Sequence, residues 1–68
     1  MKYTTISNTE LAFYIDEWIR NERDRKILKR RLIDGIRIEP LAEEFDLTVD
    51  RIKQIIYKDR AIIEQHIN

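Results

Sequence analysis

The sequence predicts a small all-α domain of about four helices, and three observations support this prediction. Apolar residues recur every three or four positions along most of the chain, which is the period of a helix with one buried face rather than of a strand. The 68 residues include only one Gly and one Pro, which leaves little room for long loops. Residues that cap or break helices stand between the periodic segments. A chain this short allows one domain with a modest core.

The first helix is predicted to begin at Ser7, Asn8 or Thr9, because each offers a side-chain oxygen to the unpaired N–H groups of a helix start. Residues 1–7 show no helical periodicity, so we expect a flexible N-terminal tail there. The apolar residues that follow have the spacing of a one-sided helix: Leu11, Tyr14, Ile15, Trp18 and Ile19. We expect Trp18 to anchor the core.

A second helix is predicted to begin after Asn21. Asp24 follows three residues later, an arrangement that resembles a capping box with Asp in place of Glu or Gln. The alternative is a single bent helix through this region. The helix should run to about Asp34 with Ile27, Leu28, Leu32 and Ile33 turned inward, and Gly35 should end it because Gly tolerates a left-handed backbone.

This second helix is strongly basic. Residues 20–31 contain seven basic and two acidic side chains, whereas residues 32–50 contain one base and six acids. We expect its outer bases (Lys26, Lys29 and Arg30) to be solvated; the alternative is contact with phosphates or an acidic partner. Arg31 projects toward the apolar side and is expected to pair with Glu43, Glu44 or Asp46.

Two further helices are predicted in the rest of the chain. Pro40 suits a first helical turn, so a short third helix should begin near Glu39. Thr48 can cap a fourth helix, which has no breaker from Val49 to His66 and whose apolar residues share one face: Ile52, Ile55, Ile56, Ile62, Ile63 and Ile67. Asp59 falls on the same face, where a bare carboxylate would be costly, so it should pair with a base or lie past the core.

The third and fourth predicted helices have the spacing of a helix-turn-helix, over about residues 38–58. Ala42 is small enough to let the two helices cross closely. Asp46 stands in the turn where such motifs often have Gly, and Asp is one of the few other residues that tolerate positive φ. The apolar and small positions are in register with the motif: Leu41, Ala42, Phe45, Leu47, Ile52 and Ile55. A helical hairpin without a ligand is the alternative.

Two stretches of the chain carry a family resemblance. One is the charged helix from Glu22 to Gly35, and the other is the run from Pro40 to Tyr57, which includes Ala42-Glu43-Glu44 and then Arg51, Lys53 and Gln54. Together they resemble region four of bacterial sigma factors and the small sigma-like proteins of bacteria and phages. The resemblance implies that residues 8–68 form a domain that binds promoter DNA in the major groove and touches RNA polymerase. Since the other sigma domains are absent, this chain alone should not initiate transcription.

The outward face of the fourth predicted helix supplies the candidate DNA-binding residues. In the major groove, Lys53 and Arg51 can donate to guanine, Gln54 can contact adenine, and Asp50 can accept from cytosine. The full set is Arg37, Thr48, Asp50, Arg51, Lys53, Gln54, Tyr57, Lys58 and Arg60, with Thr48 and Arg37 placed for phosphates. For each base the alternative is a solvated surface charge; for Asp50 it is helix capping, and for Tyr57 a cover over the core.

The composition argues against an enzyme. The chain has no Cys, one His and no Gly-rich phosphate loop, so we expect no catalytic residues, no cofactor and no metal site. No apolar run approaches the ~20 residues of a membrane span or the ~7–15 of a signal peptide, so we expect no membrane partner and a cytoplasmic location.

Two functions therefore compete. The first is a DNA-binding transcription regulator or sigma-like factor of a bacterium or phage, whose partner is double-stranded DNA. The second is an interaction module that docks on RNA polymerase or another transcription protein without reading DNA, which the zero net charge and the acids of residues 32–50 favour. The stripe formed by Ile56, Ile63 and Ile67 could serve a homodimer; the alternative is packing on the first helix.

Overall fold

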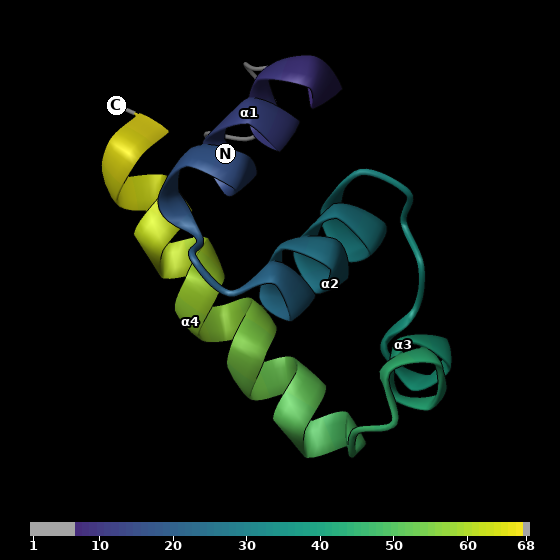
Figure 1. Ribbon diagram of the computed structural model, residues 1–68. Helices are drawn as coiled ribbons and strands as arrows, with labels where there is room; N and C mark the ends of the chain where they lie inside the picture. The colour runs from purple at the N-terminus through teal and green to yellow at the C-terminus, as the bar shows by residue number, and fades with distance from the viewer. Residues whose placement is uncertain (1–6, 68) are drawn as a thin grey trace.

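The computed structural model describes residues 7–67 and contains four helices: α1 (Asn8–Trp18), α2 (Glu22–Leu32), α3 (Ile38–Phe45) and α4 (Val49–Ile67) (Figure 1). Every regular element in this part of the chain is a helix, which confirms the predicted small all-α domain. The predicted tail lies outside the described residues except for Ser7, which caps α1.

Helix α4 is the element on which the other three are arranged. Its 19 residues span about 28 Å at 1.5 Å per residue, close to the longest dimension of the molecule, 32 Å. Each of the other helices packs against α4, α3 near its N-terminal end and α1 near its C-terminal end (Figure 1). None of the helices within residues 7–67 is long and apolar enough to cross a membrane.

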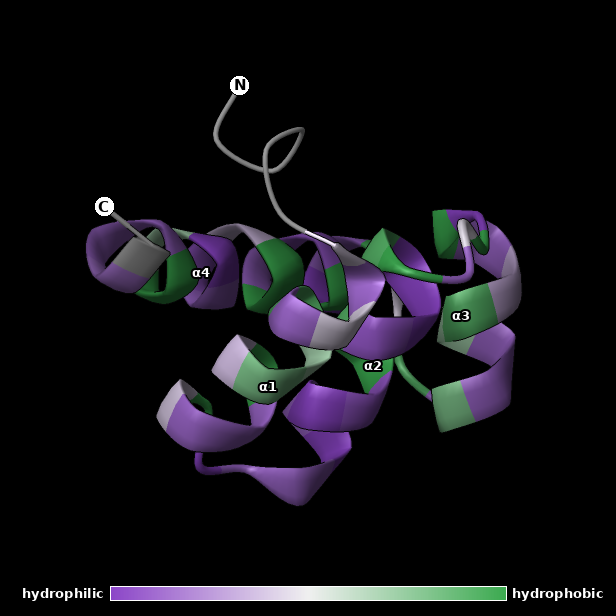
Figure 2. Ribbon diagram, turned by 90° about the horizontal axis from the view of Figure 1, so that it is seen from above, coloured by the Kyte–Doolittle hydropathy of each residue, from purple (hydrophilic) through white to green (hydrophobic). Residues whose placement is uncertain are grey.

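A single apolar core lies between the four helices. In Figure 2 apolar and polar bands alternate along α4, as expected for a helix with one buried face. The buried hydrophobic residues come from all four helices and from the turn after α1: Leu11, Ile15, Ile19, Ile27, Leu28, Leu41, Ala42, Ile52, Ile55, Ile56 and Ile63. Two aspartates, Asp24 and Asp59, are also buried.

Side-chain caps fix where three of the helices begin. The Ser7 hydroxyl accepts the Glu10 backbone N–H (3.1 Å), and the Glu10 carboxylate accepts the Ser7 backbone N–H (3.0 Å), which completes a capping box. Asn21 accepts the backbone N–H of Asp24 at 3.1 Å, so the predicted break is confirmed and the single bent helix is wrong. The Thr48 hydroxyl caps α4 as predicted.

The turns on either side of α3 use a left-handed backbone. Gly35 has φ +73°, and Asp46 has φ 56° and ψ 46°. At the second turn the Leu47 N–H donates to the Ala42 carbonyl at 2.9 Å, which satisfies one of the last carbonyls of α3. Both left-handed positions were predicted from the residue types.

The expectation that Trp18 anchors the core is wrong. Its side chain is 42% exposed and stacks flat on His66 of α4, with ring centroids 3.6 Å apart. Trp18 is the last residue of α1, so its side chain lies at the edge where α1 meets the end of α4. Ile15 and Ile19 are buried on the inner side of this segment instead.

Candidate functional site

The outer face of α4 is exposed and carries several charged and polar side chains. Ile52, Ile55 and Ile56 are buried, which turns the opposite side of the helix toward solvent. A shallow hollow of about 480 Å³ lies on this side, and we call it the outer hollow; its lining is Arg51, Lys53, Gln54, Ile55, Tyr57 and Lys58. Five of the predicted DNA-binding residues therefore share one surface.

Tyr57 is the most prominent side chain of the outer hollow. It is 83% exposed, so the alternative that it covers the core is wrong. The sequence interval explains its direction, because Tyr57 lies seven residues after Asp50 and four after Lys53, on the same side of the helix.

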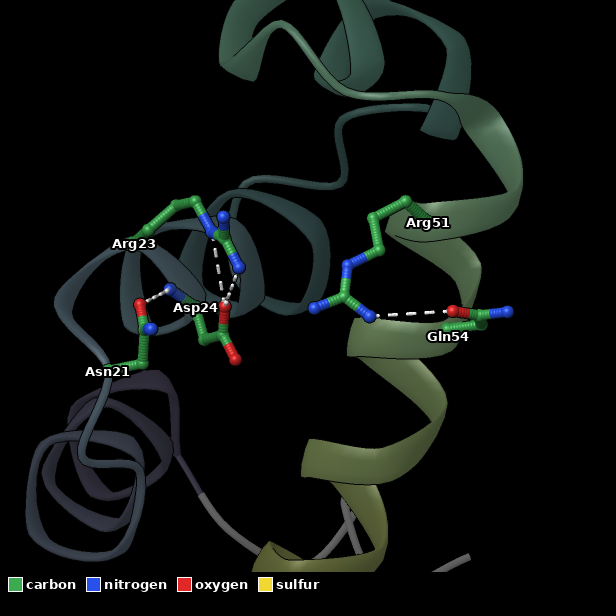
Figure 3. A network of polar contacts seen from close by, with 5 residues as sticks. All are labelled: Asn21, Arg23, Asp24, Arg51 and Gln54. Carbon is green, nitrogen blue, oxygen red and sulfur yellow. Dashed lines mark hydrogen bonds and ion pairs between the residues drawn. The ribbon is translucent and has the colours of Figure 1, made fainter.

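The first turn of α4 is locally organised. The Thr48 hydroxyl accepts the Arg51 backbone N–H at 3.1 Å, and the Arg51 guanidinium donates to the Gln54 side-chain carbonyl at 3.4 Å (Figure 3). This contact holds two candidate base-reading groups side by side. Asp50 is exposed in the same turn, where a carboxylate interacts favourably with the helix N-terminus.

A second concavity, which we call the side groove, runs between α4 and the ends of α2 and α3. It has a volume of about 500 Å³, and three cationic side chains and one acid line it: Arg31, Lys53, Arg60 and Glu64. Lys53 and Tyr57 line both the side groove and the outer hollow, so they form the ridge between the two. The basic surface therefore continues from α4 to the end of α2.

Arg31 belongs to this surface, which the sequence did not suggest. Its guanidinium donates to the Ile36 backbone carbonyl at 3.1 Å, and the expected pairing with Glu43, Glu44 or Asp46 is wrong. Arg30 makes that contact instead, with a guanidinium nitrogen 2.9 Å from a Glu44 carboxylate oxygen. The Arg31 side chain thus contacts the loop that follows α2.

The remaining outer bases of α2 are engaged by acids of the same chain. Lys29 lies 2.7 Å from the Asp16 carboxylate of α1, and Lys26 lies 3.8 Å from Glu22 on its own helix. The Lys29–Asp16 pair connects α2 to α1, and the Arg30–Glu44 pair connects α2 to α3. They leave α2 less free than α4 to meet phosphates.

Arg37 is the predicted site residue that precedes α3 instead of lying in or next to the first turn of α4. It is the N-cap residue of α3 and is exposed; like Thr48 and Asp50, it lines neither the outer hollow nor the side groove. Arg60, by contrast, lines the side groove with Lys53 and Tyr57. The predicted set therefore consists of seven residues on α4, Thr48 at its N-terminal end, and Arg37 at the N-terminal end of α3.

Asp24 and Asp59, which we call the carboxyl pair, form the most unusual electrostatic feature. They are 6% and 3% exposed, and the Arg23 guanidinium lies 3.3 Å from a carboxylate oxygen of Asp24 (Figure 3). Burial raises the pKa of Asp59 to about 6; a hydrogen bond with the Asp24 carboxyl and the Asp24 charge act in the same direction, while the charge of Lys58 opposes them. The expectation that Asp59 pairs with a base or lies past the core is wrong, because it faces a second acid.

Ile56 and Ile63 of the apolar stripe of α4 are buried within the domain. Ile56 and Ile63 are buried, and α1 packs on α4, so these two residues are not free to form a homodimer. The third member of the stripe, Ile67, has a side chain outside the described set.

The exposed face of α4 and the adjoining side groove share Lys53 and Tyr57 and together carry most of the candidate DNA-binding residues. Comparisons with protein-family models, with curated proteins and with solved structures find no match for this chain. The functional argument therefore depends on the residues of this surface, their exposure and their charge.

Proposed function

We propose that the protein binds double-stranded DNA and regulates transcription, with the outer face of α4 inserted in the major groove. The observation that carries this proposal is the outer hollow, where Arg51, Lys53, Gln54, Tyr57 and Lys58 are all exposed along one side of one helix. The major groove admits an α-helix, and these side chains present the donors and acceptors that read base edges.

The packing beneath α4 supports the proposal. Leu41 and Ala42 of α3 are buried together with Ile52 and Ile55 of α4, and the turn at Asp46 reverses the chain between the two helices. This arrangement leaves the opposite side of α4 uncovered. A helix supported in this way is what the helix-turn-helix mode of DNA binding requires.

Three side chains of the outer hollow would read base edges in the proposed complex. Lys53 and Arg51 donate to the acceptors of guanine, and Gln54 makes a bidentate contact with adenine. The contact between Arg51 and Gln54 predicts that they read neighbouring base pairs.

Phosphate contacts would come from the edges of the same surface. The Thr48 oxygen already accepts the Arg51 N–H, but its hydroxyl proton can still be donated to a phosphate. Lys58, Arg60 and Arg37 supply positive charge around α4. Such contacts fix the position of a protein on the duplex, whereas contacts to base edges provide specificity.

The acids of α3 limit the expected affinity. Glu39 and Glu43 of α3 and Asp46 of the following turn are exposed, and the chain has no net charge. A single module of this size buries only ~600–1,000 Å² on DNA. We therefore expect modest affinity for one half-site, raised by a second DNA-binding element or by a protein partner.

The same acids favour the second candidate function. In that alternative the domain docks on RNA polymerase or another transcription protein without reading DNA. Exposed carboxylates such as Glu39 and Glu43 would attract a basic protein surface, while they would repel a phosphate backbone. The two functions differ in which helix makes the contact, α4 for DNA and α3 for a protein.

Selection of duplexes from a random pool, followed by fluorescence anisotropy at 50–200 mM salt, tests the proposal directly. We expect an enriched sequence motif and an affinity that falls steeply with salt, because each neutralised phosphate releases counterions. The absence of salt-dependent binding to any duplex at low ionic strength would contradict DNA binding.

A matched pair of charge reversals locates the binding surface. Lys53→Glu should weaken binding at least ~10-fold, since a bidentate base contact is worth about 1–3 kcal/mol. Lys26→Glu makes the same charge change on α2, where the ammonium already lies near Glu22, and should have a much smaller effect. Equal losses from the two variants would show that binding is not centred on α4.

A pull-down distinguishes the second candidate. If polymerase is retained after the charged residues of the outer hollow are neutralised, and is lost on Glu39→Lys with Glu43→Lys, the protein-docking function is supported. If the outer-hollow variant loses polymerase, that function is weakened.

A further inference from the structure

The carboxyl pair lies where the turn between α1 and α2 packs against α4. Asp24 is in the first turn of α2, and Asp59 is in the middle of α4. Both border a surface pocket of about 350 Å³, whose wall includes Trp18 and whose other charged residues are Arg20 and Lys58. The pair is thus nearly inaccessible itself but has a short path to water.

The two carboxylates of the pair differ in their direct partners: Asp24 contacts a guanidinium, whereas Asp59 Oδ2 has no hydrogen-bond donor among the described residues. Arg23 of α2 contacts Asp24 at 3.3 Å, and Lys58 of α4 acts on Asp59 from an exposed position. The side-chain oxygen Asp59 Oδ2 is buried and has no hydrogen-bond donor among the described residues. A buried acceptor without a donor is costly, so the ionised pair is under strain.

A proton is the ligand that suits this arrangement. Two adjacent carboxyl groups can share one proton, which removes one buried charge and lets one carboxyl group donate a hydrogen bond to the other. A cationic ligand is disfavoured, because Arg20 and Lys58 already line the pocket. No group of three or more His, Cys, Asp or Glu side chains within residues 7–67 is arranged to hold a metal ion.

We propose that Asp24 and Asp59 form a proton-binding site that makes the packing of the α1–α2 turn on α4 dependent on pH. In the protonated state the Asp59 hydroxyl donates to the Asp24 carboxylate and joins α2 to α4. When the proton is lost, two buried negative charges repel one another, and the turn at residues 19–21 loosens from α4. The packing of α3 on α4 contains no such pair and is unaffected.

The direction of the pH effect follows from the pKa of Asp59, which rises from an ordinary value of 3.8 to about 6. The folded state therefore holds the proton more tightly than the unfolded state. The resulting stabilisation is complete below pH ~4 and is lost as the pH rises through about 6. Two pK units correspond to a change of up to about 100-fold in the folding equilibrium constant.

Urea unfolding between pH 5 and 8 tests the proposal on the whole chain. All variants carry His66→Gln, which removes the single histidine of the chain and its stack on Trp18. The reference protein should lose about 10-fold in its folding constant across this interval, while Asp59→Asn should be nearly flat and more stable at pH 8. Glu17→Gln removes an exposed acid of α1 and should keep the slope of the reference.

Carbon-13 NMR of the side-chain carboxyl groups supplies a measurement that needs no variant. The carboxyl carbon of Asp59 should titrate near pH 6 in the wild-type chain. The amide-exchange protection factors at residues 19–21, which are corrected for the intrinsic pH dependence of exchange, should fall over the same range while those at residues 45–48 stay constant. An Asp59 midpoint near 4 would overturn the proposal. So would an Asp59→Asn variant with the same pH slope as the reference.

Discussion

Helix α4 is held by two interfaces of different chemistry. Toward α3 the contact is apolar, with Leu41 and Ala42 buried together with Ile52 and Ile55. Toward α1 and α2, apolar residues such as Ile63 alternate with polar features, namely the carboxyl pair and the exposed stack of Trp18 on His66. The first interface depends on shape alone, whereas the second also depends on protonation.

This division would separate the proposed DNA-binding surface from the proposed proton-binding site along one helix. The candidate DNA-binding residues of α4 end at Arg60, and most of them precede Asp59, which belongs to the carboxyl pair of the second interface. The face that would meet DNA is therefore positioned by packing that does not titrate. A change of pH can loosen one end of α4 while the other end remains held by α3.

The largest expected effect comes from breaking the apolar interface. Ile52 has no exposed surface, so Ile52→Ala should destabilise the domain by about 2–5 kcal/mol through lost burial and the cavity left behind. A domain of this size has only a few kcal/mol of stability, and the variant should be largely unfolded near room temperature. Urea unfolding monitored by circular dichroism measures the loss.

Ile52→Val is the matched control for this prediction. It removes one methylene group and should cost about 0.5–1.5 kcal/mol, which leaves the domain folded. If Ile52→Ala were as mild as Ile52→Val, the interface would be looser than its burial indicates.

Overfilling the same interface should have the next largest effect. Ala42 is 7% exposed where α3 meets α4, and Ala42→Leu should push the two helices apart at a cost of about 1–3 kcal/mol. Glu43→Leu introduces the same side chain one residue later, at an exposed position, and should change stability by no more than about 0.5 kcal/mol. Equal losses in the two variants would show that Ala42 is not needed for a close crossing.

The helix boundaries could be predicted because they depend on local chemistry. Ser7, Asn21 and Thr48 each accept a backbone N–H three residues later, and Gly35 and Asp46 are residue types that adopt a left-handed backbone. The outer hollow could also be predicted, because residues opposite the buried isoleucines of a single helix must face solvent.

The contacts between helices could not be predicted in the same way. The helical spacing of α4 predicts that Asp59 lies on the apolar face, which is unusual for a carboxylate. Only the packing of α2 on α4 shows that Asp24 is its neighbour. Adjacent bases such as Arg30 and Arg31 differ in direction by about one quarter of a turn, and which of them meets Glu44 depends on where α3 lies. The prediction that Trp18 is buried is wrong because Trp18 is the last residue of α1, where helical periodicity does not ensure that a side chain is buried.

The smallest expected effect on stability comes from the left-handed residue Asp46 in the turn before α4. Asp46 holds φ at 56°, a conformation that costs a residue with a Cβ atom some strain, so Asp46→Gly should stabilise the domain by about 0.5–1 kcal/mol. Gly35→Ala makes the opposite change at φ +73°, with no atom within 4 Å of the added Cβ, and should destabilise by a similar amount through the backbone alone. Thermal unfolding at pH 5 and at pH 8 should give the same difference for both variants, because neither turn contacts the carboxyl pair. A pH-dependent difference at Asp46 would mean that the two interfaces of α4 are coupled through the helix.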